Sequence, residues 1–141
     1  MFDLYGQNRL AEWRRFREKL ESSETPLGDV AEFWSKAPFV SDYLDPHNPE
    51  EWPDPWHLIL DDNLDDLAIV LGMCYTLKLT ERFKDSLFEI HKHTAPDKKM
   101  HPKFYLMVDK THVLNLFYRD IASVDDLSKV PTNLIWTQNK S

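Results

Sequence analysis

The residues from Leu67 to Tyr75 are apolar on nearly every side of a helical wheel. An amphipathic helix needs cover on one face only, whereas a helix that is apolar all round has to be enclosed by the rest of the chain. This segment therefore predicts a buried central helix, from about Leu64 to Leu79, against which the other elements pack. Asp61, Asp62 and Asn63 precede it and offer N-caps, because short polar side chains accept hydrogen bonds from the free N–H groups of a helix start.

Two more helices are expected before this central helix. Apolar residues recur at three- and four-residue spacing from about Arg9 to Leu20 and make one apolar stripe. Thr25 as N-cap and Pro26 at the first helical position begin a second, shorter helix. Pro38 ends that helix, because the residue before a proline is disfavoured in the helical conformation. The four prolines between residues 39 and 55 predict a structured loop.

The second half of the chain has the period of β-strands. Apolar and polar residues alternate after residue 87, and two further apolar runs flank the turn residues Asp109 and Lys110. Ser123 begins a short helix, with Asp126 in the capping-box position. Because helices come first and antiparallel strands follow, we expect one α+β domain over residues 1–141, mainly helical over 1–80 and mainly strands over 83–137. In this fold the N-terminal helices and the central helix pack on a small antiparallel sheet. The expected strands are Phe88 to His93, Phe104 to Val108, Thr111 to Tyr118 and Leu134 to Trp136.

Charge is unevenly distributed along the chain. Between Lys36 and Lys78 there is no lysine or arginine, and the stretch holds nine carboxylates, against a formal net charge of −7 for the whole chain. An acidic balance argues against nucleic-acid binding, because affinity for a phosphate backbone comes from clustered lysine and arginine. The same stretch contains Trp52-Pro53-Asp54-Pro55-Trp56, a rigid, aromatic and acidic segment.

Basic residues gather near the N-terminus instead. They form either a solvated helix face, balanced by neighbouring glutamates, or a docking face for an acidic partner. The acidic stretch of another copy of the chain is one such partner. The basic residues are Arg9, Arg14, Arg15, Arg17 and Lys19.

The expected compartment follows from what the sequence lacks. No apolar run approaches the ~20 residues of a membrane span, and the N-terminal residues lack the basic start and apolar stretch of a secretion signal. The single cysteine, Cys74, excludes an internal disulfide and fits a reducing compartment. Because it lies mid-helix among apolar neighbours, we expect a packed and unreactive thiol. We therefore expect a cytoplasmic protein that does not bind membranes.

The acids before the central helix resemble the opening of a calcium loop. Asp61, Asn63 and Asp65 have the alternate spacing of its first ligands. Position 66 is aspartate where the tight turn requires glycine, and position 72 is glycine where the bidentate glutamate belongs. Acids at a helix start are also expected without an ion, because they cap N–H groups and interact favourably with the helix dipole. We therefore expect helix capping rather than a metal site.

Histidines offer a second possible metal site. Glu89, His91 and His93 share one face of a predicted strand, where two imidazoles can reach one metal ion. His101 or His112 could supply a third ligand. The opposite face of that strand is apolar and should face the core, so the histidine face is expected to be solvated, with metal binding as the alternative.

The order of elements from residue 52 to 126 follows a known pattern. A lead rich in Trp and Pro, residues 52–59, precedes a helix start at residues 63–68 that reads Asn-Leu-Asp-Asp-Leu-Ala. This order resembles the core of the transglutaminase-like cysteine hydrolases, in which Gly-Asp-Cys-Asp-Asp-Leu-Ala begins a buried helix. The resemblance implies that His112 and Asp125 hold the places of the family's histidine and aspartate. Leu64 stands at the place of the nucleophilic cysteine, so the resemblance implies a catalytically inactive scaffold.

A second resemblance concerns origin. Residues 12–17, Glu-Trp-Arg-Arg-Phe-Arg, together with residues 52–56, look like segments of small proteins encoded by marine tailed phages. This resemblance implies a viral source, and the compartment would then be the cytoplasm of the host cell. It implies nothing about mechanism.

Two functions of different classes follow from these patterns. The first is a non-enzymatic binding or assembly protein whose acidic, Trp- and Pro-rich surface contacts a protein partner or a second copy. The alternative is a hydrolase-like or metal-dependent enzyme on a transglutaminase-like scaffold, using a histidine with an acid from residues 61–66. No catalytic residue, metal ligand or cofactor is assigned. The candidate binding residues are Asp45, Trp52, Asp54, Trp56, Asp61, Asp65 and His112.

Overall fold

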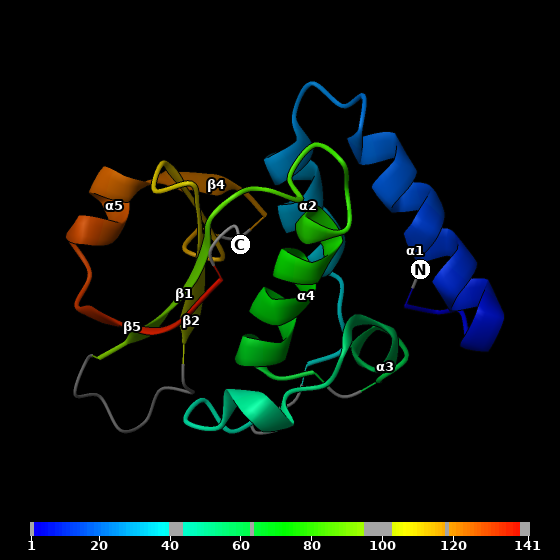
Figure 1. Ribbon diagram of the computed structural model, residues 1–141, viewed down its shortest axis with the longest axis horizontal. Coiled ribbons are helices and arrows are strands. Elements are labelled where there is room, and N and C mark those ends of the chain that lie inside the picture. Colours follow the sequence, from blue (N-terminus) through cyan, green and yellow to red (C-terminus); the bar gives the residue numbers. More distant parts are fainter. Residues whose placement is uncertain (1, 40–43, 63, 95–102, 118, 139–141) are drawn as a thin grey trace.

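The computed structural model describes residues 2–39, 44–62, 64–94, 103–117 and 119–138. Over these ranges the chain forms five α-helices and a five-stranded antiparallel sheet with the strand order β4-β3-β2-β1-β5. The helices come first and the strands fill the C-terminal half, which confirms the expected α+β fold (Figure 1). Within the same ranges, no helix combines the length and apolarity that a membrane span requires.

The element boundaries are close to those expected from periodicity. The helices are α1 (Gly6–Leu20), α2 (Pro26–Trp34), α3 (Pro55–Ile59), α4 (Asp66–Lys78) and α5 (Val124–Ser128), with a 3-10 turn η1 at Pro49–Glu51. The strands are β1 (Phe88–His93), β2 (Phe104–Val108), β3 (His112–Leu114), β4 (Ile121–Ser123) and β5 (Thr132–Gln138).

Helix α4 is the central element of the fold. Nine of its residues are buried, as the all-round apolar pattern predicted. Figure 1 shows α4 between the sheet and α1, with α5 on the opposite side of the sheet. The N-cap is Asp65, whose carboxylate accepts a hydrogen bond from the Ala68 N–H at 2.8 Å. The expectation that Asp61 or Asp62 caps this helix is therefore wrong, and Asn63 lies outside the described residues.

Three helices meet at the hydroxyl group of Thr76. This oxygen accepts hydrogen bonds from the indole N–H groups of Trp13 on α1 and Trp34 on α2, both at 3.0 Å. The hydroxyl itself donates to the carbonyl oxygen of Gly72, at 2.7 Å. All three side chains that meet here are at most 1% exposed. Buried indole N–H groups need an acceptor, and a single threonine serves both.

Gly72 lets the Trp34 ring lie directly against the backbone of α4. A Cβ atom at this position would overlap three carbon atoms of the Trp34 ring. The ring cannot move aside without losing its hydrogen bond to Thr76. Close approach of an aromatic ring therefore explains a glycine in the middle of a buried helix.

We expect Gly72→Ala to lower the free energy of unfolding by about 1–3 kcal/mol, because overpacking against Trp34 outweighs alanine's helix propensity. Gly28 in α2 is the matched control, since a Cβ there meets nothing within 4 Å. Gly28→Ala should stabilise the protein by ~0.5–1 kcal/mol. Urea unfolding followed by circular dichroism measures both changes, and an equal effect at the two glycines would contradict the packing argument.

Both faces of the sheet are covered. The face toward α4 carries the main core, and β2 is buried along its whole length. The other face carries a smaller apolar cluster under α5 that includes Tyr105, Val113 and Leu127. The Ser123 capping box at the start of α5 is present as expected.

The strand after the Asp109-Lys110 turn differs from its prediction. The turn itself is confirmed, with φ of 52° and 56° at its two residues, as in a tight hairpin. Strand β3 ends at Leu114 instead of continuing to residue 118, and strand β4 was not predicted. The cause is Asn115, whose φ of 72° breaks the extended conformation.

Candidate functional site

The aspartates at the start of α4 are held inside the fold. Asp65 is only 6% exposed, and its second carboxylate oxygen accepts a hydrogen bond from the Leu44 N–H at 2.9 Å. One side chain thus caps α4 and fixes the end of the preceding loop. Asp65 therefore has a structural role, which agrees with the capping interpretation of these acids.

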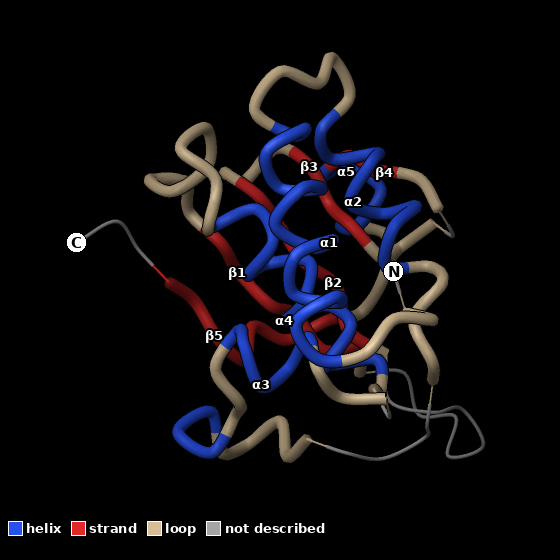
Figure 2. The backbone as a smooth tube through the Cα atoms, turned by 90° about the vertical axis from the view of Figure 1, so that its right-hand side faces the viewer, coloured by secondary structure: helices blue, strands red, loops and turns tan. Residues whose placement is uncertain are grey.

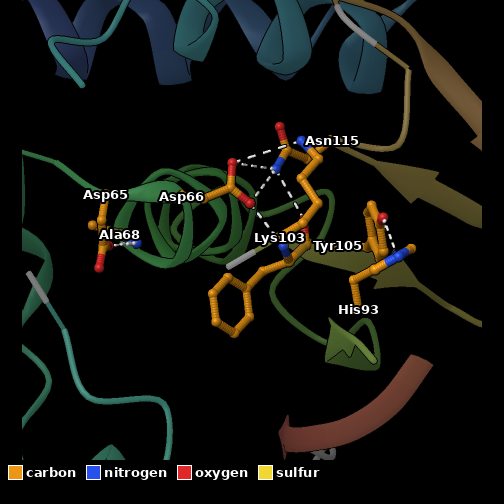
Figure 3. A network of polar contacts seen from close by, with 8 residues as sticks. Asp65, Asp66, Ala68, His93, Lys103, Tyr105 and Asn115 are labelled. Atoms are coloured by element: carbon orange, nitrogen blue, oxygen red, sulfur yellow. Dashed lines mark hydrogen bonds and ion pairs between the residues drawn. The ribbon is translucent and has the colours of Figure 1, made fainter. Parts of the chain in front are cut away.

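Asp66 joins the start of α4 to two strands (Figure 3). Its carboxylate accepts hydrogen bonds from the Phe104 N–H at 2.7 Å and from the Asn115 amide at 3.1 Å, and the Lys103 ammonium lies 3.6 Å away. The Asn115 amide also donates to the Phe104 carbonyl at 2.9 Å. Burial raises the pKa of the Asp66 carboxyl, while Lys103 and the hydrogen bonds oppose that rise. This network was not predicted, because it joins residues 38 and 49 positions apart.

Asp66 also lines a small cavity of about 220 Å³ with Lys103, Asn115 and Arg119. Ser35 is on the wall of this cavity, and its hydroxyl donates to the Glu32 carbonyl at 2.6 Å. The single thiol, Cys74, is fully buried, and this burial raises its pKa to about 12. Neither the Ser35 hydroxyl nor the Cys74 thiol is therefore placed as an activated nucleophile.

The residues of the transglutaminase-like pattern lie in different parts of the fold. Leu64 is fully buried next to α4. His112 pairs with Val108 at one end of β2, whereas Asp66 binds Phe104 at the other end, four residues or ~13 Å away. Asp125 belongs to α5, on the far side of the sheet. His112 is exposed and lines a separate cleft of about 520 Å³.

The Glu89, His91 and His93 face of β1 is less solvated than expected. Glu89 is only 9% exposed, and the other two are half-buried. The His93 ring nitrogen lies 3.0 Å from the Tyr105 hydroxyl. In the part of the chain that the structure describes, no group of three or more histidine, cysteine or acidic side chains is arranged to hold a metal ion. His101, one of the two proposed additional ligands, lies outside that part.

The loop before α3 is fixed to the body of the protein by Trp52. The Trp52 indole N–H donates to the Asp45 carbonyl at 2.8 Å, and its ring lies 6.1 Å from the ring of Trp136 on β5. The Tyr75 hydroxyl donates to the Pro53 carbonyl at 2.7 Å and ties the same loop to α4. Trp52 and Asp45 therefore stabilise this loop.

Asp54 caps α3 from the position directly before Pro55. Its carboxylate accepts hydrogen bonds from the His57 N–H at 2.9 Å and lies 2.8 Å from the His57 ring nitrogen. These hydrogen bonds lower the pKa of the Asp54 carboxyl. The cap determines the direction in which α3 leaves the loop and thereby the position of Trp56.

Asp61 and Asp62 contact Arg9, which is 1% exposed. The expectation that Arg9 belongs to a solvated basic face is therefore wrong. Its guanidinium donates to the Asp62 carboxylate at 2.7 Å and to the Asp61 carbonyl at 3.1 Å. Its remaining hydrogen bonds are to the carbonyl oxygens of Phe2 at 2.9 Å, Leu4 at 2.8 Å and Ile59 at 3.2 Å.

Trp56 remains at the surface, 48% exposed. Its ring lies edge-on to the buried Trp13 ring, with the centroids 5.7 Å apart. The Arg17 guanidinium lies 4.5 Å from the Trp13 centroid and 5.7 Å from that of Trp56. These residues border a groove of about 510 Å³ between α1 and α3, which we call the Trp–Arg groove. It is lined by Gln7, Leu10, Ala11, Arg14, Arg17 and Trp56.

Among the candidate binding residues, Trp56 lines a surface groove that also contains the Arg17 guanidinium, whereas His112 lines the separate cleft. Arg17 makes no hydrogen bond or ion pair with any described residue, and its Nε atom is buried. The contact between Arg17 and Trp13 could be predicted locally, because the two residues are four positions apart and share one face of α1. The contact of Arg17 with Trp56 joins distant residues and could not be predicted in this way.

Comparison of the chain with protein-family models, with curated proteins and with solved structures found no match.

Proposed function

We propose that the protein is a non-enzymatic binding or assembly protein that contacts a protein partner through the surface around Trp56. The observation that carries this proposal is a half-exposed tryptophan held against a stacked arginine at the border of a groove. Tryptophan and arginine are the side chains most enriched at binding hot spots. A ring already held in place by its neighbours loses little conformational entropy when a partner covers it.

The acidic segment supports this function mainly through its rigidity. The cap at Asp54 and the contacts of Trp52 hold the short helix that presents Trp56. Asp45, Trp52 and Asp65 thus serve the binding surface indirectly. If the chain is viral, as its resemblance to phage proteins implies, its partner is in the cytoplasm of the infected cell.

The hydrolase-like alternative receives no comparable support. It requires a nucleophile and a histidine at the start of α4, where Leu64 is buried and Asp66 is engaged by Phe104 and Asn115. His112 lies at the other end of β2. The binding function is therefore the one that we carry forward.

Photo-crosslinking tests the proposal at the residue that carries it. We expect p-benzoylphenylalanine at position 56 to give a covalent adduct with a protein, in cells that express the chain or in the purified sample. The control is the same amino acid at Val124, which is 36% exposed on α5, behind the sheet. Equal adduct yields at positions 56 and 124 would contradict the proposed surface.

The partner captured at position 56 permits a quantitative measurement. Trp56→Ala should weaken its binding by at least about 30-fold, the loss expected at a hot spot. Circular dichroism of the variant verifies that the fold is retained. A change of less than about threefold would show that Trp56 is not the anchor of the interface.

A further inference from the structure

We propose that the Trp–Arg groove binds the acidic turn η1 of a second copy of this chain, so that the protein associates as a two-fold dimer. The inference rests on the proposed function, because Trp56 belongs to the same surface, and it names the partner.

The groove has an unused cationic group. The Arg17 guanidinium lies over the Trp13 ring, with its Cζ atom 4.5 Å from the ring centroid. None of the guanidinium N–H groups has an acceptor among the described residues, although Nε is shielded from solvent. Partial burial and the neighbouring Arg14 also lower the pKa of Arg17. A carboxylate is the natural partner, because it accepts two parallel hydrogen bonds from a guanidinium.

The rest of the groove fits a short peptide with acidic side chains. Leu10, Ala11 and Trp56 supply apolar surface, and its volume of about 510 Å³ is in the usual range of ligand sites. Arg14 is a second cation at the border, and no carboxylate is among the lining residues. Arg14 pairs with Glu18 at 3.2 Å in an exposed ion pair, which is weak enough to exchange partners.

The chain itself carries a matching acidic segment. Turn η1 exposes two consecutive glutamates, Glu50 and Glu51, and the turn is held by Pro49 and by the Trp52 contacts. Neither glutamate side chain makes a hydrogen bond or an ion pair with any described residue. One surface of the molecule thus has unpaired carboxylates and another has an unpaired guanidinium.

The relative positions of these two surfaces favour a second copy of the chain. Figure 1 shows η1, by its teal colour, at the lower edge of the molecule and α1 at the far right, with α3 between them. A two-fold axis near α3 can therefore place each acidic turn over the groove of the other copy, which gives two identical contacts. A nucleic acid is a poorer partner, because a net charge of −7 repels an extended polyanion.

Charge reversal tests this dimer by sedimentation velocity over a concentration series. We expect concentration-dependent dimers for the wild type, weakened at least tenfold by Arg17→Glu and equally by the double variant Glu50→Arg/Glu51→Arg. An equimolar mixture of the two variants should dimerise again, because both contacts then join opposite charges. Arg15→Glu is the matched control: Arg15 pairs with Glu12 on α1 outside the groove, so reversing it should leave the dimer intact.

Three results would overturn the dimer: a wild type that stays monomeric at ~1 mM, association that survives both reversals, or a mixture of the variants that stays monomeric. These results leave the proposed function open to its own test, since crosslinking at position 56 can still identify another protein. Conversely, the dimer could respond to the charge reversals as expected while crosslinking at position 56 gives no adduct. That combination would locate the contact at Arg17 and not at Trp56. Circular dichroism of each variant verifies that the fold is intact.

Discussion

Replacing Arg9 with methionine is expected to lower the free energy of unfolding by about 3–5 kcal/mol, the range seen when a buried charge network is broken. All five N–H donors of this guanidinium have acceptors, and four of these are backbone carbonyls. Methionine fills a similar volume but donates no hydrogen bond, so the carbonyls lose their partners without regaining full access to water. Because small domains have a total stability of ~5–15 kcal/mol, the variant should be close to unfolding.

Two variants identify the source of this loss. Arg9→Lys keeps the positive charge but has three donors on one atom, so it should restore only a minor part of the stability. Arg15→Met makes the same substitution at an exposed position of α1 that pairs only with Glu12, and should cost less than about 1 kcal/mol. Urea unfolding measures all three proteins. Full restoration by lysine would mean that charge, rather than the set of directed hydrogen bonds, is what Arg9 contributes.

Thr76→Val should lower the free energy of unfolding by about 2–6 kcal/mol. Valine has nearly the shape of threonine, so the packing of α4 is retained. Its missing oxygen leaves the N–H groups of Trp13 and Trp34 without their acceptor, at ~1–3 kcal/mol for each buried donor. Both rings are 1% exposed, so water cannot replace the lost oxygen.

Thr76→Ser is the matched variant, because serine keeps the oxygen and removes the methyl group. It should lose only the ~1 kcal/mol expected for one buried methyl. Urea unfolding gives the stability difference, and the indole N–H resonances in NMR spectra report whether the hydrogen bonds remain. Equal stability of the valine and serine variants would mean that the shared hydrogen bonds contribute little.

Local sequence patterns predicted most of the elements of this fold. The apolar stripe of α1, the Thr25-Pro26 pair before α2 and the capping box at Ser123 are all encoded within a few residues, and each is present. The same locality explains the error at residues 115–118, where apolar residues continue beyond the strand. Strand β3 ends at Leu114, because the next residue, Asn115, has a positive φ and its amide binds Asp66 and Phe104, and neither partner is near it in the sequence.

The candidate site was predicted only in part for the same reason. Trp56 stood out as an aromatic residue in a rigid acidic segment, and it is exposed next to a groove. Trp52 had the same local signal, yet it is turned toward Trp136 on the last strand. Arg17 was one of several basic residues on α1, and only its contacts with two tryptophans distinguish it from Arg14 and Arg15.

The sequence alone determined most of the helices and strands and that α4 is enclosed, because side-chain periodicity and capping act over a few residues. Only the tertiary structure decided which polar groups meet. Arg9 bonds to residues 50 to 53 positions away, and Thr76 bonds to tryptophans 63 and 42 positions away. Hydrogen bonds depend on distance and direction in space, so no local pattern specifies such partners. The groove at Trp56 and Arg17 likewise exists only because α3 packs against α1.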